Sequence, residues 1–331
     1  MESDHTMNQI RWGIIGCGDV TEVKSGPGFQ KAEGSALLAV MRRDRAKAED
    51  YARRHNVPRV HATAEALIRD PDIDAVYIAT PPSTHCQLAL MVAAAGKPCL
   101  VEKPMAGNHA ECVRMVVAFK RAGQPLWVAF YRRALPRFLK VRELLRDGAI
   151  GQVTSVHLQI TEPRVTAERV KNWRFDRAIA GAGLFFDLGS HCFDVVDFLV
   201  GEISAVAGFS INTAQAYEAE DVTSAAFQIG NAVAGIGIWN FNAASVIDRL
   251  VFTGSKGELS TPILFDQDVI ITVGGERTVF PIRNPPHVHQ PLIQTIVDEL
   301  HGRGRCESTG ASGARSAWVM DQCLGNYYEK N

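Results

Sequence analysis

The sequence of 331 residues predicts an α/β protein of two domains, the first built on a parallel sheet and the second on a mostly antiparallel sheet. Two observations carry this prediction. Up to about residue 130, short and continuously apolar segments alternate with helical segments, as in a doubly wound parallel sheet with both faces covered. After that point, longer segments alternate between apolar and polar residues, which is typical of antiparallel strands with one face in water.

The first domain is expected to contain six strands, each a short apolar run bounded by turn residues. They are predicted at residues 10–15, 36–41, 59–61, 75–79, 99–101 and 126–130. Helical patterns occupy the intervals at residues 44–55, 63–69, 83–95 and 108–122. Polar residues suited to N-capping open three of these helices: Thr63, Ser83 or Thr84, and Asn108.

The second domain opens with an amphipathic helix at residues 136–147. Strands are predicted at residues 153–160, 204–211, 223–229, 233–241, 250–253 and 269–273, and further helices at residues 185–200, 291–300 and 310–328. We therefore divide the chain into domains at residues 7–130 and 131–331. Residues 1–6 are polar and are expected to form a disordered tail.

Composition argues against several classes of protein. With 35 basic and 36 acidic side chains the net charge is -1, so a bulk nucleic-acid partner is not expected. No apolar run is long enough to cross a membrane, and the polar N-terminus does not resemble a signal peptide. The seven cysteines are scattered without metal-ligand spacing, so we expect reduced thiols in the cytoplasm and no metal site.

A glycine turn, Gly16-Cys17-Gly18-Asp19-Val20-Thr21, directly follows the first predicted strand. In this position Gly16 permits a tight turn, and Gly18 lets the backbone approach a pyrophosphate at a helix N-terminus. Thr21 stands where the usual fingerprint has glycine or alanine. The turn predicts a dinucleotide-binding domain of the Rossmann type, with Gly16, Gly18, Asp19 and Val20 against the cofactor.

The residues after the second strand bear on which dinucleotide binds. An NAD-specific domain usually places an acid there for the ribose 2′-hydroxyl. Here the strand is followed by Arg42, Arg43 and Asp44. The two guanidinium groups can pair with a 2′-phosphate, which favours NADP, although Asp44 keeps NAD open and the arginines could simply begin a solvated helix.

Further short motifs follow in a fixed order along nearly the whole chain. They are Ala79-Thr80-Pro81-Pro82-Ser83-Thr84-His85, Gly96-Lys97-Pro98, Glu102-Lys103-Pro104, Gly148-Ala149-Ile150-Gly151 and Gly183-Leu184-Phe185-Phe186-Asp187-Leu188-Gly189-Ser190-His191. Together with the glycine turn, this set resembles the Gfo/Idh/MocA family of nicotinamide-dependent oxidoreductases. That family includes glucose–fructose oxidoreductase, inositol dehydrogenase and dihydrodiol dehydrogenase.

The resemblance implies a Rossmann domain followed by a domain with a large open antiparallel sheet, which often joins subunits into homodimers or homotetramers. It also implies that Lys103 contacts both substrate and nicotinamide ribose, and that Asp187 and His191 form a catalytic pair. Four residues that follow the strands predicted at residues 75–79 and 99–101 are expected on the cofactor: Thr80, Pro81, His85 and Glu102. For His85, helix capping or packing explains the residue equally well.

Physical chemistry supports the catalytic residues. Lys103 precedes a proline, so its backbone is extended at the strand edge where ligands of open α/β sheets bind, and its ammonium can stabilise a developing alkoxide. Asp187 and His191 are four residues apart and share one helix face, where a histidine can accept a proton near neutral pH. Nearby glycines are expected to allow close ligand contact: Gly181, Gly183 and Gly189.

Other polar and aromatic residues lie on segments expected to line the substrate cleft, although packing roles are equally open for them. They are Tyr131, Arg133, Arg164, Trp173, Arg174 and Asp194. The leading hypothesis is transfer of a hydride between nicotinamide and a secondary alcohol or ketone of a sugar, polyol or cyclic diol. Two alternatives stay open: a non-catalytic dinucleotide-binding regulator, which would not need Lys103, Asp187 and His191 together, and a lyase or hydrolase that retains its NAD.

Overall fold

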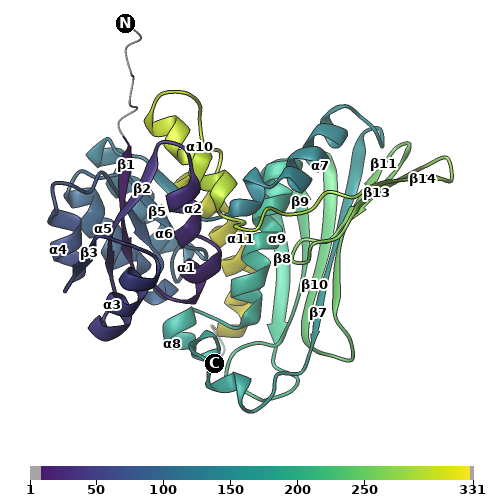
Figure 1. Cartoon of the computed structure of the whole chain (residues 1–331). Helices are drawn as coiled ribbons and strands as arrows, with labels where there is room; N and C mark the ends of the chain where they lie inside the picture. The colour runs from purple at the N-terminus through teal and green to yellow at the C-terminus, as the bar shows by residue number, and fades with distance from the viewer. Residues whose placement is uncertain (1–8, 329–331) are drawn as a thin grey trace, which may run out of the picture. The chain divides into compact units, whose positions relative to one another are not determined.

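The computed structural model describes residues 9–328, so the predicted tail at residues 1–6 lies outside the described part of the chain. The chain forms two compact units. In the described range, the first comprises residues 9–102, 113–134 and 285–310, and the second comprises residues 103–112, 135–284 and 311–328. Each unit is built around one sheet (Figure 1).

The first unit contains a six-stranded parallel sheet with the strand order β3-β2-β1-β4-β5-β6. All six strands were predicted, with boundaries that shift by no more than two residues. They are β1 (Ile10–Ile15), β2 (Ser35–Met41), β3 (Arg59–His61), β4 (Ala75–Ile78), β5 (Cys99–Val101) and β6 (Leu126–Val128). Because β4 and β5 are buried at every residue, the expectation of helices on both faces is confirmed.

The helices that accompany this sheet are α1 (Asp19–Val23), α2 (Gly26–Lys31), α3 (Arg45–Arg54), α4 (Ala64–Arg69), α5 (His85–Ala94), α6 (His109–Ala122) and α10 (Gln290–Leu300). Thr63 caps α4 as predicted, since its hydroxyl accepts the backbone N–H of Ala66 at 3.1 Å. Thr84 stands at the N-cap of α5 as predicted, but its side chain makes no capping hydrogen bond. Its hydroxyl lies 2.7 Å from the Thr80 hydroxyl and 2.9 Å from the carbonyl oxygen of Pro81 instead.

The second unit contains an eight-stranded mixed sheet with the order β14-β13-β12-β11-β7-β10-β9-β8. Only β7 and β10 run parallel, and every other pair is antiparallel. The strands are β7 (Val153–Pro163), β8 (Ile203–Ile211), β9 (Val222–Ile229), β10 (Val233–Ala243), β11 (Ile247–Gly254), β12 (Gly257–Thr261), β13 (Val269–Val273) and β14 (Glu276–Phe280). The expectation of a large, mostly antiparallel sheet is confirmed.

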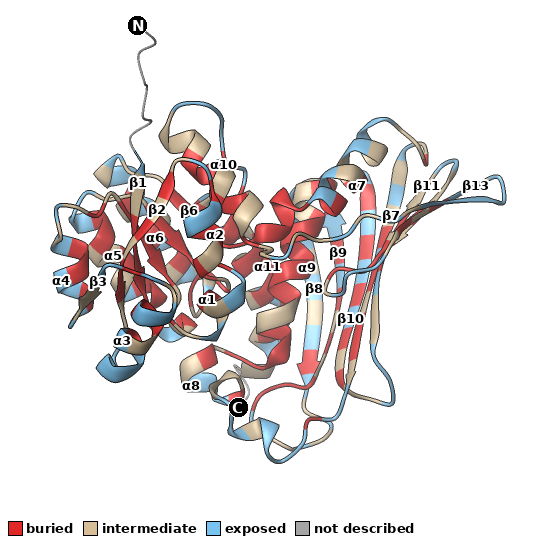
Figure 2. Ribbon diagram, viewed as in Figure 1, coloured by how far each residue is buried: buried red, intermediate tan, exposed pale blue. Residues whose placement is uncertain are grey.

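The longer helices of this unit are α7 (Pro136–Arg146), α9 (Leu184–Leu199) and α11 (Gly310–Tyr328), with the short helix α8 (Arg177–Ala180) before α9. An aromatic cluster holds α9 on the sheet, because the Trp239 ring of β10 lies 4.9 Å from Phe185 and 5.1 Å from Phe193. The segment Arg177–Leu199 is long and apolar enough to cross a membrane, but 78% of its apolar window is buried inside the protein, as in a core helix. Figure 2 shows α9 buried along most of its length.

The units interleave along the chain, unlike the single division expected at residue 130. The segment 285–310 returns to the first unit because it covers the edge strand β6 and the helix α2. The indole of Trp127 donates to Glu299 at 3.1 Å, and the backbone of Val128 donates to Ser308 at 3.0 Å. A Cβ at Gly28 would lie 2.8 Å from Ile293, so α2 and α10 pack closely.

Candidate functional site

The glycine turn fits a bound pyrophosphate. Gly16 has a φ of +95°, and a Cβ there would lie 2.7 Å from the Thr80 methyl group, so only glycine suits this position. Gly18 precedes α1, and a Cβ there would meet nothing nearer than a carbonyl oxygen at 3.9 Å, which leaves space beside the backbone. The departure at Thr21 is explained by packing, since its buried hydroxyl donates to the Gly18 carbonyl at 2.7 Å and closes the turn.

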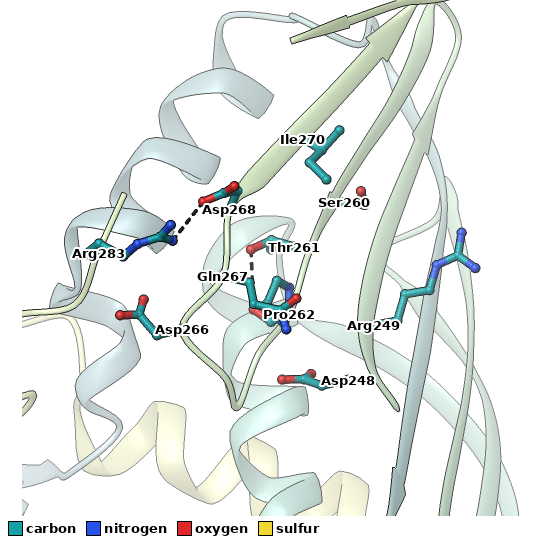
Figure 3. Close-up of a pocket in the computed structure, with 10 residues that line it drawn as sticks. All are labelled: Asp248, Arg249, Ser260, Thr261, Pro262, Asp266, Gln267, Asp268, Ile270 and Arg283. Atoms are coloured by element: carbon teal, nitrogen blue, oxygen red, sulfur yellow. Dashed lines mark hydrogen bonds and ion pairs between the residues drawn. The ribbon is translucent and has the colours of Figure 1, made fainter. Parts of the chain in front are cut away.

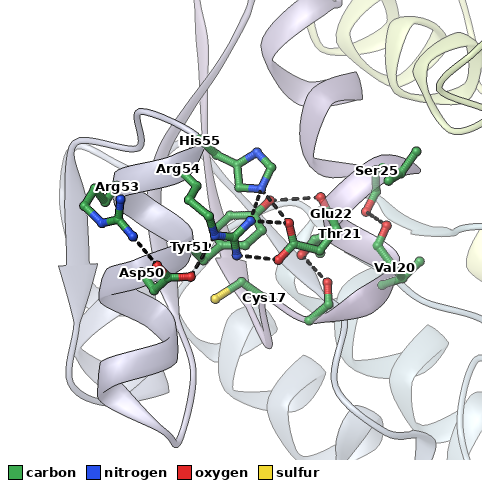
Figure 4. A network of polar contacts seen from close by, with 12 residues as sticks. Cys17, Val20, Thr21, Glu22, Ser25, Asp50, Tyr51, Arg53, Arg54 and His55 are labelled. Carbon is green, nitrogen blue, oxygen red and sulfur yellow. Dashed lines mark hydrogen bonds and ion pairs between the residues drawn. The ribbon is translucent and has the colours of Figure 1, made fainter.

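A polar network joins the short helix α1 to α3 (Figure 4). Arg54 donates two N–H groups to the carboxylate of Glu22, each at 2.7 Å, and Nε2 of His55 lies 2.7 Å from the same carboxylate. The hydrogen bonds from Arg54 lower the pKa of Glu22 to about 2. The Tyr51 hydroxyl donates to the Thr21 carbonyl at 3.0 Å. The short helix that follows the glycine turn is therefore fastened to α3.

Arg42, the first of the two arginines after β2, lies next to this turn. Nη1 of Arg42 donates to the carbonyl of Cys17 at 3.0 Å, which places one guanidinium against the turn itself. Asp44, the residue that kept NAD open, is the N-cap of α3 and accepts the backbone N–H of Lys47 at 3.2 Å. That hydrogen bond lowers the pKa of Asp44. The carboxylate therefore already has a structural role.

The segment after β4 lies against the glycine turn through Thr80. His85 is fully buried, and its Nε2 lies 2.7 Å from the carbonyl oxygen of Thr80. This contact supports the packing explanation for His85. Through it, the imidazole fixes the backbone that carries Thr80 and Pro81. Cofactor contacts of these three residues stay predictions.

Glu102, expected on the cofactor, is buried and engaged within the first unit. The Tyr77 hydroxyl of β4 donates to its carboxylate, and Nε2 of His289 lies 3.0 Å from the same oxygen. Burial, with the nearby charge of Glu102, raises the pKa of Tyr77 well above its ordinary value. The ring of Tyr131 stacks on His289 with centroids 4.4 Å apart. His289 was not identified from the sequence because 187 residues separate it from Glu102.

The proposed catalytic residues all belong to the second unit. Lys103 forms an ion pair with Oδ1 of Asp187, and Nε of Arg174 lies 3.7 Å from Oδ2 of the same carboxylate. His191 lies one turn further along α9 and is buried, and Asp194, three residues beyond it, is fully buried. The sequence associated Asp187 with His191, whereas the structure gives its carboxylate a cationic partner in Lys103. A cation, a carboxylate and an imidazole are thus gathered at one helix.

The glycines around this helix have a packing reason that the sequence did not indicate. A Cβ at Gly189 would lie 2.7 Å from the Phe185 ring, and one at Gly181 would lie 3.0 Å from the Phe186 ring. At Gly183 it would lie 2.4 Å from the backbone oxygen of Glu220. Close contact with protein groups is therefore one reason for glycine at these positions, and the expected contact with a ligand stays a prediction.

The predicted cleft residues divide between the units. Arg133 is buried and donates to the carbonyl of Glu307 at 3.2 Å, and Arg164 donates to the carbonyl of Ala214 at 3.0 Å. Trp173 is half-buried, with the Arg174 guanidinium 4.5 Å from its ring centre, beside the Asp187 carboxylate. Of this group, Arg174 approaches the Asp187 carboxylate with Trp173 beside it, and Asp194 lies on the same helix as His191.

A separate cavity of about 400 Å³ lies in the second unit (Figure 3). It is lined by Asp248, Arg249, Ser260, Thr261, Pro262, Asp266, Gln267, Asp268, Ile270 and Arg283. Three of its charged side chains already have partners within the protein, because Asp248 accepts three backbone N–H groups and Arg283 pairs with Asp268 at 2.8 Å. Within residues 9–328, no three histidine, cysteine or acidic side chains gather as metal ligands would.

Sequence models of known families match most of the chain. Residues 10–130 match the model described as "Oxidoreductase family, NAD-binding Rossmann fold". Residues 138–260 match the model of the Gfo/Idh/MocA C-terminal domain. The two matched regions lie within the two predicted domains, on either side of residue 131.

Full-length relatives agree with these matches. The chain is 41% identical to "Oxidoreductase P35" of Formosa agariphila, over 96% of this chain and 99% of that protein. It is 26% identical to trans-1,2-dihydrobenzene-1,2-diol dehydrogenase of Xenopus laevis, over 85% of this chain and 83% of that protein. The structure of levoglucosan dehydrogenase in complex with NADH and levoglucosan superposes with a TM-score of 0.85, at 22% identity and with 98% of each chain covered.

Proposed function

Since the chain belongs to the Gfo/Idh/MocA family of oxidoreductases, we propose that it is an NADP-preferring dehydrogenase or reductase acting on a secondary alcohol or the corresponding ketone. The observation that carries this proposal is the ion pair between Lys103 and Asp187, one turn from His191 on α9. An imidazole can accept the proton of an alcohol, a cation can stabilise the alkoxide that forms, and a carboxylate can hold that cation in place.

Oxidation of a secondary alcohol removes a hydride from carbon and a proton from the attached oxygen. A nicotinamide, when bound, accepts the hydride at its C4. His191 accepts the hydroxyl proton, and the ammonium of Lys103 donates a hydrogen bond to the same oxygen, which stabilises the negative charge that develops there. Asp187 holds that ammonium in position through the ion pair. Reduction of the ketone runs through the same steps in reverse.

The decisive experiment combines a substrate screen with His191→Ala. The panel contains levoglucosan, D-glucose, myo-inositol and trans-cyclohexane-1,2-diol, each with NAD and NADP, and reduced-nicotinamide absorbance is followed. The variant should lose about 10²–10⁴-fold in kcat while its Kd for NADP stays unchanged. His157→Ala, at an exposed histidine on β7, is the matched control. Wild-type turnover in His191→Ala would refute the assignment.

The substrate class is proposed as a small polyol, sugar or cyclic diol. Relatives named as dihydrodiol dehydrogenases support it. If the protein instead keeps its cofactor through gel filtration and reduces none of it in bulk, the retained-cofactor lyase or hydrolase is favoured. If no member of the panel is turned over and cofactor binding alters association with another protein, the regulatory alternative is favoured.

The preference for NADP rests on Arg42 and Arg43, since Asp44 is already used as a helix cap. Arg43→Gln should raise the Kd for NADP by about 10–100-fold, the loss expected for one charge-assisted hydrogen bond, and leave the Kd for NAD unchanged. Arg45→Gln is the matched control, because that exposed guanidinium pairs with Glu49 on its own helix. Equal affinity of the wild type for both dinucleotides would overturn the preference.

We also propose a homodimer or homotetramer in the cytoplasm, formed through the open face of the eight-stranded sheet. Large apolar side chains are exposed on that sheet: Phe209 at 58%, Ile211 at 42%, Ile236 at 54% and Ile238 at 39%. Apolar surface gathered in this way is typical of an interface with a second copy. Sedimentation of the wild type should give at least a dimer, and Ile236→Glu should dissociate it. A monomeric wild type would contradict the proposal.

A further inference from the structure

A buried carboxylate lies at the beginning of the helix that carries Asp187 and His191. Glu220, just before β9, is fully buried. Both of its carboxylate oxygens accept the backbone N–H of Gly183, at 3.0 and 3.1 Å. Gly183 is the N-cap of α9 and has no side chain with which to cap it. The glutamate therefore supplies from another segment the acceptor for the N-cap backbone N–H that an N3 glutamate supplies in a capping box.

The carboxylate is itself held by neighbouring elements. The Tyr328 hydroxyl of α11 donates to its Oε2, and the Arg177 guanidinium of α8 lies 3.8 Å from the centre of the Tyr328 ring. The Tyr217 hydroxyl points to the backbone carbonyl of Glu220 at 3.5 Å. Asp221, the next residue, is turned to the backbone N–H groups of the 213–214 loop. One cation, two tyrosines and one acid thus surround the group.

The contact has little freedom to shift. A Cβ at Gly183 would lie 2.4 Å from the Glu220 carbonyl oxygen and 2.8 Å from its Oε1, so the two segments of the chain are in close contact here. A negative charge at this end of a helix also interacts favourably with the aligned peptide dipoles. Asp187 lies in the first turn of α9, and His191 lies one turn later. A small displacement at Gly183 is therefore passed directly to both side chains.

We infer that Glu220 is a positioning residue, whose carboxylate fixes the N-terminus of α9 and thereby sets the positions of Asp187 and His191, with Tyr328 holding the carboxylate in place. The inference rests on the proposed function, because it takes α9 as the helix of the reacting groups. Glu220 thus connects α11, through Tyr328, to α9, through Gly183.

The link is sensitive to pH. Burial raises the pKa of Glu220 to about 7, although the hydrogen bonds from Tyr328 and Gly183 oppose this rise. Protonation of Glu220 below that pH removes the negative charge beside the N-terminus of α9 and weakens the hydrogen bonds that the carboxyl group accepts from Gly183. The N-terminus of α9 should therefore loosen locally as the pH falls through neutrality, while Glu220 itself stays buried. Global unfolding has the opposite pH dependence, because it exposes Glu220 to water.

The test measures hydrogen–deuterium exchange of α9 amides against pH, corrected for the intrinsic pH dependence of exchange, so it needs no substrate. Glu220→Gln should increase exchange in the first turns of α9 by about fivefold at pH 8, the effect of losing one helix cap, and should abolish the pH dependence. Tyr328→Phe removes a donor to the carboxylate, so the pH midpoint should move upward. Tyr327→Phe is the matched control, because that hydroxyl donates to the carbonyl of Glu218.

Unchanged exchange in both Glu220→Gln and Tyr328→Phe, or equal effects of Tyr328→Phe and Tyr327→Phe, would overturn the inference. Tyr328→Phe keeps the test valid if Glu220→Gln does not fold. Turnover of a panel substrate should fall at least about fivefold in Glu220→Gln, while the Kd for NADP stays within twofold. The failures are distinguishable: an active His191→Ala refutes the proposed function alone, whereas an inactive His191→Ala beside a normal Glu220→Gln refutes the positioning role alone.

Discussion

Replacing Glu220 with glutamine should change how the stability of the protein depends on pH. The ordinary pKa of a glutamate is 4.5, and burial raises that of Glu220 to about 7. Between these values the folded protein holds a proton that the unfolded chain has released, so the free energy of unfolding falls as the pH rises through this window. The pKa difference, at about 1.4 kcal/mol for each pH unit, corresponds to about 3 kcal/mol. Glutamine cannot titrate, so the free energy of unfolding of the variant should not fall in this way as the pH rises.

The assay is urea unfolding of the wild type and Glu220→Gln at about pH 5 and about pH 8, followed by tryptophan fluorescence. Relative to the wild type, the variant should gain about 3 kcal/mol between the two pH values, because contributions from all other groups cancel in the difference. Glu218→Gln, an exposed carboxylate two residues earlier, controls for the general effect of removing a charge. Parallel pH dependences of the wild type and Glu220→Gln would refute the reasoning.

Three further predictions concern the first unit. Phe29→Ala should lower the free energy of unfolding by about 3–5 kcal/mol, because this buried ring lies 4.8 Å from Trp12 and 5.1 Å from Tyr77; a loss under about 1 kcal/mol by urea titration would contradict it. Glu22→Gln should lower the free energy of unfolding by an amount on the order of 1 kcal/mol after solvent screening. The wild type has this stabilisation above pH 4.5 and loses it as the pH falls through about 2, so identical acid unfolding curves of the two proteins would disprove it. Thr21→Val removes the hydrogen bond across the glycine turn, so it should lower the free energy of unfolding by about 1 kcal/mol and raise the Kd for NADP. An unchanged Kd by calorimetry would contradict a role of this hydroxyl in cofactor binding.

The first sheet was predictable because β4 and β5 are short, apolar on both faces and closed by turn residues. The strands β12 and β14 were not predicted. The strand β12 has only five residues and opens with a glycine, and β14 is an edge strand whose first four residues are exposed. Neither shows the apolar alternation by which sequence reasoning recognises a strand.

The proposed catalytic residues could be found because each lies in a short local motif: Lys103 before a proline, and Asp187 and His191 four residues apart on one helix. Their partners could not. His289 reaches Glu102 across 187 residues, and Glu220 reaches Gly183 across 37, so no spacing in the sequence connects them. Contacts of this kind depend on how the sheets are assembled, which local patterns do not encode.

The interleaving of the units has a consequence for biosynthesis. Domains of nascent proteins usually fold in order as they leave the ribosome, beginning with the N-terminal one. Here the nucleotide-binding unit lacks its last segment until residue 310 has emerged, after nearly all of the second unit has been made. A fragment that stops at residue 130 would leave β6 and α2 without the cover that α10 and its neighbours provide. The nucleotide-binding unit can therefore be completed only after residues 135–284 of the second unit have already been synthesised.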